Sequence, residues 1–225
     1  MKRTAATILL ILLALTSVSA VDISGYVGIS TGYEFNVINS EISNSDGSLK
    51  YNKEMNFQGV PFYLEGETYF CPWVGMYYGV SMFTFPTVLK EGDVSYKPFD
   101  DNAPTLYTSP YLGLALRYDF TDMIALVLNT GLSYTAWRLP VVDEPEQADY
   151  LHMMNVKCDL TLGIHPKYNM SVRIGLKVDT PVYTGFTHTR EETGIKLGGF
   201  SAEAVGAKLV PYIGLGYAYG RRYDK

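Results

Sequence analysis

Successive side chains of this chain alternate between apolar and polar over eight separate segments. Between 23 and 37 the odd positions read Ile, Gly, Val, Ile, Thr, Tyr, Phe and Val, and the even positions are mostly polar or glycine. Between 170 and 182 the even positions read Met, Val, Ile, Leu, Val, Thr and Val, separated by Ser, Arg, Gly, Lys, Asp and Pro. Because strand side chains point alternately to opposite faces, each segment has one apolar and one polar face. The pattern predicts an all-β fold and, repeated around a closed sheet, is typical of a membrane-spanning β-barrel.

The eight segments are joined by connections of two kinds. Those near 71–73, 121–122 and 166–169 are short, whereas those near 38–56, 87–106, 138–152 and 184–201 are long and polar. Each segment exceeds the roughly 9–11 residues that a tilted strand needs to cross a bilayer. We therefore predict an eight-stranded antiparallel transmembrane β-barrel with short periplasmic turns, long outer loops and both termini in the periplasm. The expected strands are 22–37, 57–70, 74–86, 107–120, 123–137, 153–165, 170–183 and 202–219.

The first twenty residues have the features of a secretory signal peptide. Lys2 and Arg3 supply a positive start, 8–15 form an apolar run, and Val18-Ser19-Ala20 is a small-residue cleavage site. The run is too short to span a membrane, which favours cleavage over anchoring. We expect 1–20 to be removed and 21–225 to form one barrel domain.

Charge and composition exclude several classes of protein. Removing Lys2 and Arg3 from the 18 basic residues leaves 16 against 23 acidic ones, a net charge of −7. This charge disfavours nucleic-acid binding, which needs basic surfaces. No later stretch reaches the 18 or so apolar residues of a membrane helix. Cys71 and Cys158 fall on non-adjacent expected strands, so we expect them to be unpaired despite the oxidising compartment.

Alternation alone leaves open which face looks outward, since a soluble lipocalin-type barrel would turn its apolar face inward. Two features favour the membrane interpretation. The polar face is rich in Gly, Ser and Thr and carries few charges, unlike a solvated surface. Aromatic residues gather near the strand ends of the apolar face, as in the girdles of membrane barrels. They are Tyr33, Phe35, Phe70, Tyr118, Phe120, Tyr134, Tyr217 and Tyr219.

The polar face also carries six acidic and five basic residues, which we expect to form a charge network in the lumen. An eight-stranded barrel is just wide enough for side chains to fill it, so we favour a lumen plugged by ion pairs over a selective ion path. The network residues are Glu34, Glu65, Glu67, Arg117, Asp119, Lys157, Asp159, Arg173, Lys177, Asp179 and Lys208.

Charge also predicts the register of the hairpin that joins 153–165 to 170–183. One register places Asp159 opposite Lys177 and Lys157 opposite Asp179, so that both pairs match in sign. A slip of two residues places Lys157 against Lys177, and we therefore predict the first register. Arg117 is expected to reach Glu65 or Glu67 across two glycines of the 74–86 strand.

Some residues fit this pattern less well. Pro61, Pro86, Pro110 and Pro181 lie toward the long-loop ends of their strands and indicate bulges, because proline cannot donate to the ladder. Pro211 lies deeper, and its position has no explanation from the sequence. On the polar face of the 74–86 strand, Tyr77, Phe83 and Phe85 could fill space near the rim or line a hydrophobic inner channel.

The sequence shows no convincing catalytic, cofactor or metal site. Its three histidines are His152, near the expected outer rim, His165, near the periplasmic end, and His188, in an expected loop. None has the serine-containing surroundings of a nucleophile–base pair, and a Ser or Asp within hydrogen-bond reach of His152 would be needed for a lipid-modifying enzyme. Acidic stretches lack calcium-loop spacing. We predict no catalytic residue, no cofactor and no metal.

The last strand resembles the C-terminal assembly signal of outer-membrane barrels through Tyr212, Gly214, Tyr217 and Tyr219, although six residues follow the final aromatic. In strand number and loop asymmetry, the whole mature chain resembles the small barrels of the OmpA, OmpX and OmpW type. This resemblance implies the bacterial outer membrane, with outer-membrane lipid and the barrel assembly machinery as partners. It also implies a non-enzymatic structural or surface-exposed role, with an extracellular or host ligand contacted through the outer loops. The alternative is a narrow OmpW-like, porin-like channel for small hydrophobic or ionic solutes.

Overall fold

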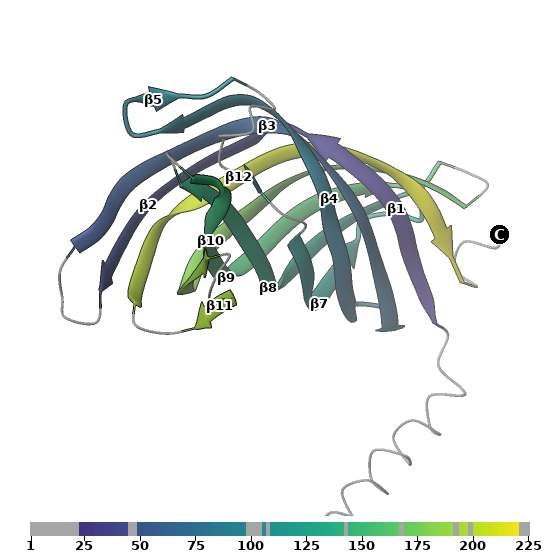
Figure 1. Cartoon of the computed structure of the whole chain (residues 1–225). Coiled ribbons are helices and arrows are strands. Elements are labelled where there is room, and N and C mark those ends of the chain that lie inside the picture. Colours follow the sequence, from purple (N-terminus) through teal and green to yellow (C-terminus); the bar gives the residue numbers. More distant parts are fainter. Residues whose placement is uncertain are drawn as a thin grey trace, which may run out of the picture.

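Eight antiparallel strands close into a ring, so that the first and last strands of the chain are neighbours (Figure 1). The computed structural model describes residues 23–44, 49–97, 105–106, 109–141, 144–166, 169–190, 194–197 and 200–220. The expected signal peptide, 1–20, lies outside these residues. The strands are β1 (Ser24–Gly32), β2 (Glu34–Asn44), β3 (Leu49–Cys71), β4 (Val74–Glu91), β5 (Val94–Ser95), β6 (Thr105–Leu106), β7 (Ser109–Asp119), β8 (Ile124–Val141), β9 (Glu144–Ile164), β10 (Met170–Arg190), β11 (Gly194–Leu197) and β12 (Phe200–Tyr219).

The ring runs β1, β3, β4, β7, β8, β9, β10, β12 and back to β1. This confirms the predicted eight-stranded antiparallel barrel. The turns at 72–73, 120–123 and 165–169 are short, as expected. No helix in the part of the chain that the structure describes is long and apolar enough to cross a membrane.

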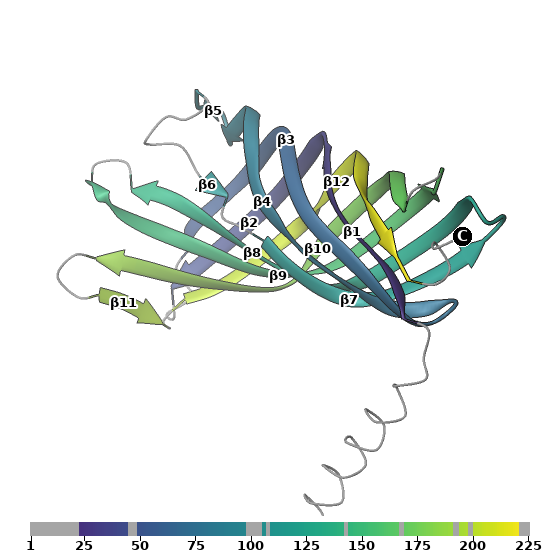
Figure 2. The same ribbon diagram turned by 90° about the vertical axis from the view of Figure 1, so that its right-hand side faces the viewer.

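The long outer connections differ from the prediction, because much of their length is strand. β3, β9 and β10 each run for 21 residues or more, and the hairpins β2–β3 and β8–β9 continue well past the expected strand ends. Figure 2 shows these extensions at the end of the barrel opposite to the start of β1. Cross-strand pairing therefore continues above the membrane instead of giving way to loops.

Proline explains a break in the first strand. β1 and β2 pair with β12 in one continuous register that stops at Gly32↔Tyr212 and resumes at Phe35↔Leu209. Tyr33 lies opposite Pro211 in this register and donates its N–H to the Pro211 carbonyl at 3.1 Å. Proline has no N–H to return a hydrogen bond, so the ladder is interrupted at this point. This is the role of Pro211 that the sequence left unexplained.

Bulges at other prolines change which face a side chain occupies. The β3–β4 register shifts beside Pro61 and opposite Pro86, and the β9–β10 register shifts at Pro181. The shift at Met82 turns Phe83 and Phe85 outward, each with 47 % of its surface exposed, whereas Tyr77 is buried inside. The suggestion that Phe83 and Phe85 line the lumen is therefore wrong, because one extra residue inverts the alternation.

The apolar face of the barrel points outward. Ile29, Leu112, Leu114, Ile213 and Leu215 each expose more than half of their surface. A soluble barrel would bury these side chains, so the exposed belt marks the surface that faces lipid.

Candidate functional site in the barrel lumen

The charged side chains of the polar face lie in the interior of the barrel. Ten of the eleven expected network residues are buried, and Asp119 is partly exposed near the periplasmic end. They come from β2, β3, β7, β9, β10 and β12, because each of these strands places every second residue inward. Their ion pairs form three layers along the barrel.

The layer nearest the periplasm is built on Glu67 and Arg173. The guanidinium binds both carboxylate oxygens, with Nη2–Oε2 at 2.8 Å and a short Nη1–Oε1 contact. Tyr69 donates to the same carboxylate at 2.7 Å and Asn129 at 3.0 Å. The Arg173 guanidinium also lies 3.4 Å from the centroid of the Tyr26 ring. A bidentate, charge-assisted pair with additional donors is a strong arrangement for a buried carboxylate.

Arg117 lies in the same part of the lumen. It donates its Nε–H to Asp119, two residues along β7, at 2.8 Å and lies over the Tyr69 ring. Of the two carboxylates that we expected it to reach, Glu65 lies 2.9 Å from Lys177 and Glu67 binds Arg173.

The middle layer is centred on Lys177. Its ammonium lies 2.9 Å from Glu65, donates to Ser30 at 3.1 Å, and lies 3.2 and 4.6 Å from the centroids of the Tyr212 and Tyr63 rings. An ammonium against aromatic faces gains a cation–π attraction that increases when water is absent. Lys177 thus binds one carboxylate and two rings at the centre of the barrel.

Asp159 lies directly opposite Lys177 in the β9–β10 register, as predicted. Its carboxylate accepts hydrogen bonds from Tyr77 at 3.2 Å, Tyr212 at 3.0 Å and Thr161 at 2.8 Å. The cross-strand position is therefore confirmed, but Lys177 forms its ion pair across the lumen with Glu65.

The upper layer joins two lysines through one carboxylate. Asp179 lies 3.1 Å from Lys157 and 2.9 Å from Lys208. Lys157 pairs with Asp179 across the β9–β10 ladder, which confirms the second half of the predicted register. Glu34 lies in the same region and accepts a hydrogen bond from Asn36 at 3.3 Å.

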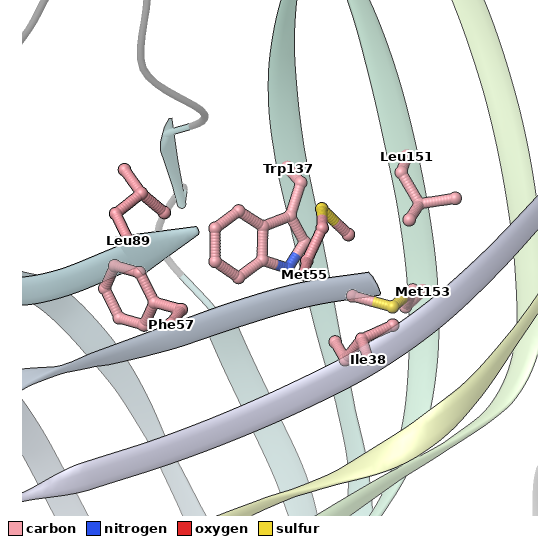
Figure 3. Packing of buried hydrophobic residues seen from close by; sticks show 7 residues of the cluster. All are labelled: Ile38, Met55, Phe57, Leu89, Trp137, Leu151 and Met153. Atoms are coloured by element: carbon pink, nitrogen blue, oxygen red, sulfur yellow. The ribbon is translucent and has the colours of Figure 1, made fainter. Parts of the chain in front are cut away.

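Above this layer the interior becomes apolar (Figure 3). Seven buried side chains from β2, β3, β4, β8 and β9 pack together, and Phe57 and Trp137 meet edge to face at 5.2 Å. The members are Ile38, Met55, Phe57, Leu89, Trp137, Leu151 and Met153.

At the height of this apolar cluster, the side chains on the outer face of the barrel change from apolar to polar. Along β2, exposed Phe35 and Val37 are followed by exposed Asn39 and Glu41. Around Ile38, Met55 and Phe57 the inner face is therefore apolar while the adjacent outer positions Asn39, Glu54 and Asn56 are polar, the reverse of the arrangement lower in the barrel. Sequence reasoning missed this cluster, although the inversion of the alternation along the 34–44 and 49–60 segments was a readable signal.

Apart from Tyr77, which was expected on the polar face, the lumenal tyrosines were also missed. Tyr26, Tyr63, Tyr69, Tyr77, Tyr111 and Tyr212 are buried inside the barrel, whereas the expected girdle residues Tyr118, Tyr134 and Tyr217 are exposed outside. The sequence separates the two groups only through the parity of each position in its strand.

The predicted assembly signal is divided between the two faces of β12. Tyr212 and Gly214 point into the lumen, and Tyr217 is exposed on the outside. Tyr219 lies over Gly25 of β1 and forms a 2.9 Å hydrogen bond with Thr68 of β3. Tyr219 therefore bridges the closing seam of the barrel.

The histidines occupy three different settings. His152 lies on the outer face, where Nδ1 is 2.6 Å from the Tyr134 hydroxyl and Nε2 is 2.8 Å from the Thr187 hydroxyl. These partners are neither the Ser nor the Asp that a lipid-modifying enzyme was expected to need. His165 is buried beside Arg117 and Arg173, and burial is the main cause that lowers its pKa to about 4. The side chain of His188 lies outside the described part of the structure.

The cysteines and the acidic residues bear on whether the chain could hold a disulfide or a metal ion. Cys71 and Cys158 are free thiols. Within the described ranges, no group of three or more His, Cys, Asp or Glu side chains is placed to hold a metal ion.

Comparison with known proteins places the fold. No family model matches the sequence, and no curated protein matches it. Among solved structures, the outer membrane protein OprG from Pseudomonas aeruginosa is similar with a TM-score of 0.61 and 10% identity, over 89% of this chain and 97% of that one. The outer membrane protease OmpT from Escherichia coli is similar with a TM-score of 0.52 and 10% identity, over 88% and 96%. The chain has the fold of bacterial outer-membrane β-barrels, a fold that includes a protease as well as other outer membrane proteins.

Proposed function

We propose that this chain is a non-enzymatic, integral outer-membrane β-barrel with a charge-plugged lumen. The observation that supports the proposal is the set of buried ion pairs and tyrosines in the interior, with an apolar cluster above them. Eight strands leave an interior only wide enough for side chains. A permeating ion would have to break buried ion pairs, which is costly.

Single-channel recording in planar bilayers tests the plug. The refolded mature protein should give no stable conductance steps, and neither should Lys157→Met, which keeps the side-chain volume. Its folded state is checked by the mobility of the unheated protein on a denaturing gel. Stable steps from the folded wild-type protein would overturn the plugged lumen.

A plugged barrel acts through its surfaces, and we assign the role of this chain to its outer extensions. The strands continue above the membrane with their own apolar core, so they can present their outer ends to an extracellular or host ligand. Outer-membrane lipid surrounds the exposed belt, and the barrel assembly machinery is the partner proposed for Tyr212, Gly214, Tyr217 and Tyr219. Cells that display the barrel should bind a host-cell surface, and a variant in which residues 191–199 are replaced by a short Gly-Ser sequence should bind less at equal display.

The second candidate is a narrow OmpW-like channel for small hydrophobic or ionic solutes. The observation that favours it is a split in the wall, because β10 and β12 pair only as far as Asp179↔Lys208. A cavity of about 10 Å³ lies at this split, between Pro181 and Ala207, with Lys208 below and Ile38 above. Its volume is at the lower limit of what one water molecule needs. Uptake of an apolar fluorescent solute into liposomes that contain the barrel, absent from protein-free liposomes, would favour this candidate over the plug.

A further inference from the structure

The lipid-facing wall carries a second, larger cavity at the seam between the first and last strands. It has a volume of about 170 Å³ and lies on the outer face over β1 and β12. The facing pairs Ile29↔Leu215 and Thr31↔Ile213 form its walls, and Phe62 of β3 lies opposite Thr31.

This cavity is open toward the lipid as a groove, and its lining contains almost no polar group. Thr31 donates its hydroxyl to the Pro61 carbonyl at 2.9 Å and so has no need of another partner. Ser30 and Gly214, which form the floor with their backbone, are buried toward the lumen, where Ser30 accepts a hydrogen bond from Lys177. Water would find no partners in such a site, and an empty groove forfeits dispersion contacts.

The groove is also held open. Phe62 stacks on Phe83 with ring centroids 4.9 Å apart and meets Phe85 edge to face at 5.9 Å. These contacts hold the Phe62 ring against β4, on the side away from the groove. Ile29, Ile213 and Leu215 expose 52–60 % of their surface, so the groove is reached from the lipid side.

We propose that this groove binds one hydrocarbon chain of a membrane lipid. We identify the ligand from the location of the groove, because the exposed apolar belt around it is the surface covered by the hydrocarbon core of the bilayer. Lipid chains are as apolar as the lining, so shape and dispersion, not exclusion of water, retain the chain. The seam between the first and last strands is thus packed from outside by lipid.

Photocrosslinking tests the site directly. The full mature barrel is reconstituted in vesicles that contain a phosphatidylcholine with a diazirine at mid-chain, irradiated, and mapped by mass spectrometry. Adducts should be several-fold enriched at Ile29, Thr31 and Ile213 over lipid-facing residues elsewhere on the wall, such as Leu128. Thr31→Phe fills the groove and should remove the enrichment.

Thr130→Phe is the matched control. Thr130 is also half-buried, on the lipid-facing side of β8, and its hydroxyl has one contact, to Cys158 at 3.8 Å. This variant should leave the groove adducts unchanged, and Ile213→Trp serves as a second groove-filling variant if Thr31→Phe does not fold. Even labelling around the barrel, or seam cross-links to a second copy of the chain in place of lipid, would overturn the proposal.

Discussion

Replacing Glu67 by Gln should strongly destabilise the barrel, because it leaves the Arg173 guanidinium as an unpaired charge in a closed interior. Both side chains are almost fully buried, and the pair is bidentate. Gln keeps the size of the side chain, so Tyr69 and Asn129 retain a partner while the charge disappears. Breaking one partner of a buried ion pair costs about 3–5 kcal/mol. We expect a loss of this size in the free energy of unfolding.

The measurement is reversible unfolding in urea from lipid vesicles, followed by tryptophan fluorescence. Arg173→Met alone should also destabilise, because it leaves the Glu67 carboxylate unpaired. The double variant should lose less than the sum of the two single losses, since it removes both charges together. Glu203→Gln is the control: this carboxylate is exposed on β12, and its removal should change stability by no more than about 0.5 kcal/mol.

A small effect of Glu67→Gln would refute this reasoning. If the variant lost less than about 1 kcal/mol, the value typical of a neutral hydrogen bond, then water would reach Arg173 and replace the lost charge. The lumen would then be wet at this level, and the plugged interior would have to be abandoned with it.

Three further predictions concern other parts of the barrel. Lys177→Ala removes the ion-pair partner of Glu65 and opens space at the centre of the lumen, so bilayer recordings should show cation-selective conductance steps. Lys177→Met keeps the side-chain volume and should show no conductance steps. His165 has a pKa of about 4 in the folded barrel against 6.5 in the unfolded chain. Its contribution to the free energy of unfolding is therefore complete above pH 6.5 and is lost as the pH falls toward 4. Unfolding measured as a function of pH should show this loss, at most about 3 kcal/mol, and His165→Phe should abolish it. Gly25→Val places a Cβ 2.3 Å from the Glu67 carbonyl oxygen and from the Tyr219 hydroxyl, so it should reduce the yield of folded barrel on gels of unheated protein. A wild-type yield would show that the seam tolerates the added side chain.

Local patterns in the sequence were enough to establish the barrel. Period-two alternation located all eight strands, and the short connections located the periplasmic turns, because both depend on neighbouring residues. The pairing of Lys157 with Asp179 was predictable for the same reason: a short turn joins the two strands, and only one register matched their charges.

Contacts across the lumen were not predictable in this way. Glu65 meets Lys177 and Glu67 meets Arg173, although 112 and 106 positions of the chain separate the two partners. Which inward side chains meet depends on how far the strands are staggered when the sheet closes, and that stagger is a property of the whole ring. The sequence predicted which charged residues point inward, whereas the pairing between them depends on how the barrel closes.

The sequence by itself determined the strand number, the polar and apolar faces and the residues available to fill the interior, since alternation is imposed by the backbone of every strand. The tertiary structure alone decided three other features. A bulge turned Phe83 and Phe85 to the lipid side, hairpin pairing extended the strands above the membrane, and the closing of β1 on β12 created the groove beside Thr31. Each of these depends on where one strand meets another, and no stretch of sequence read alone contains that information.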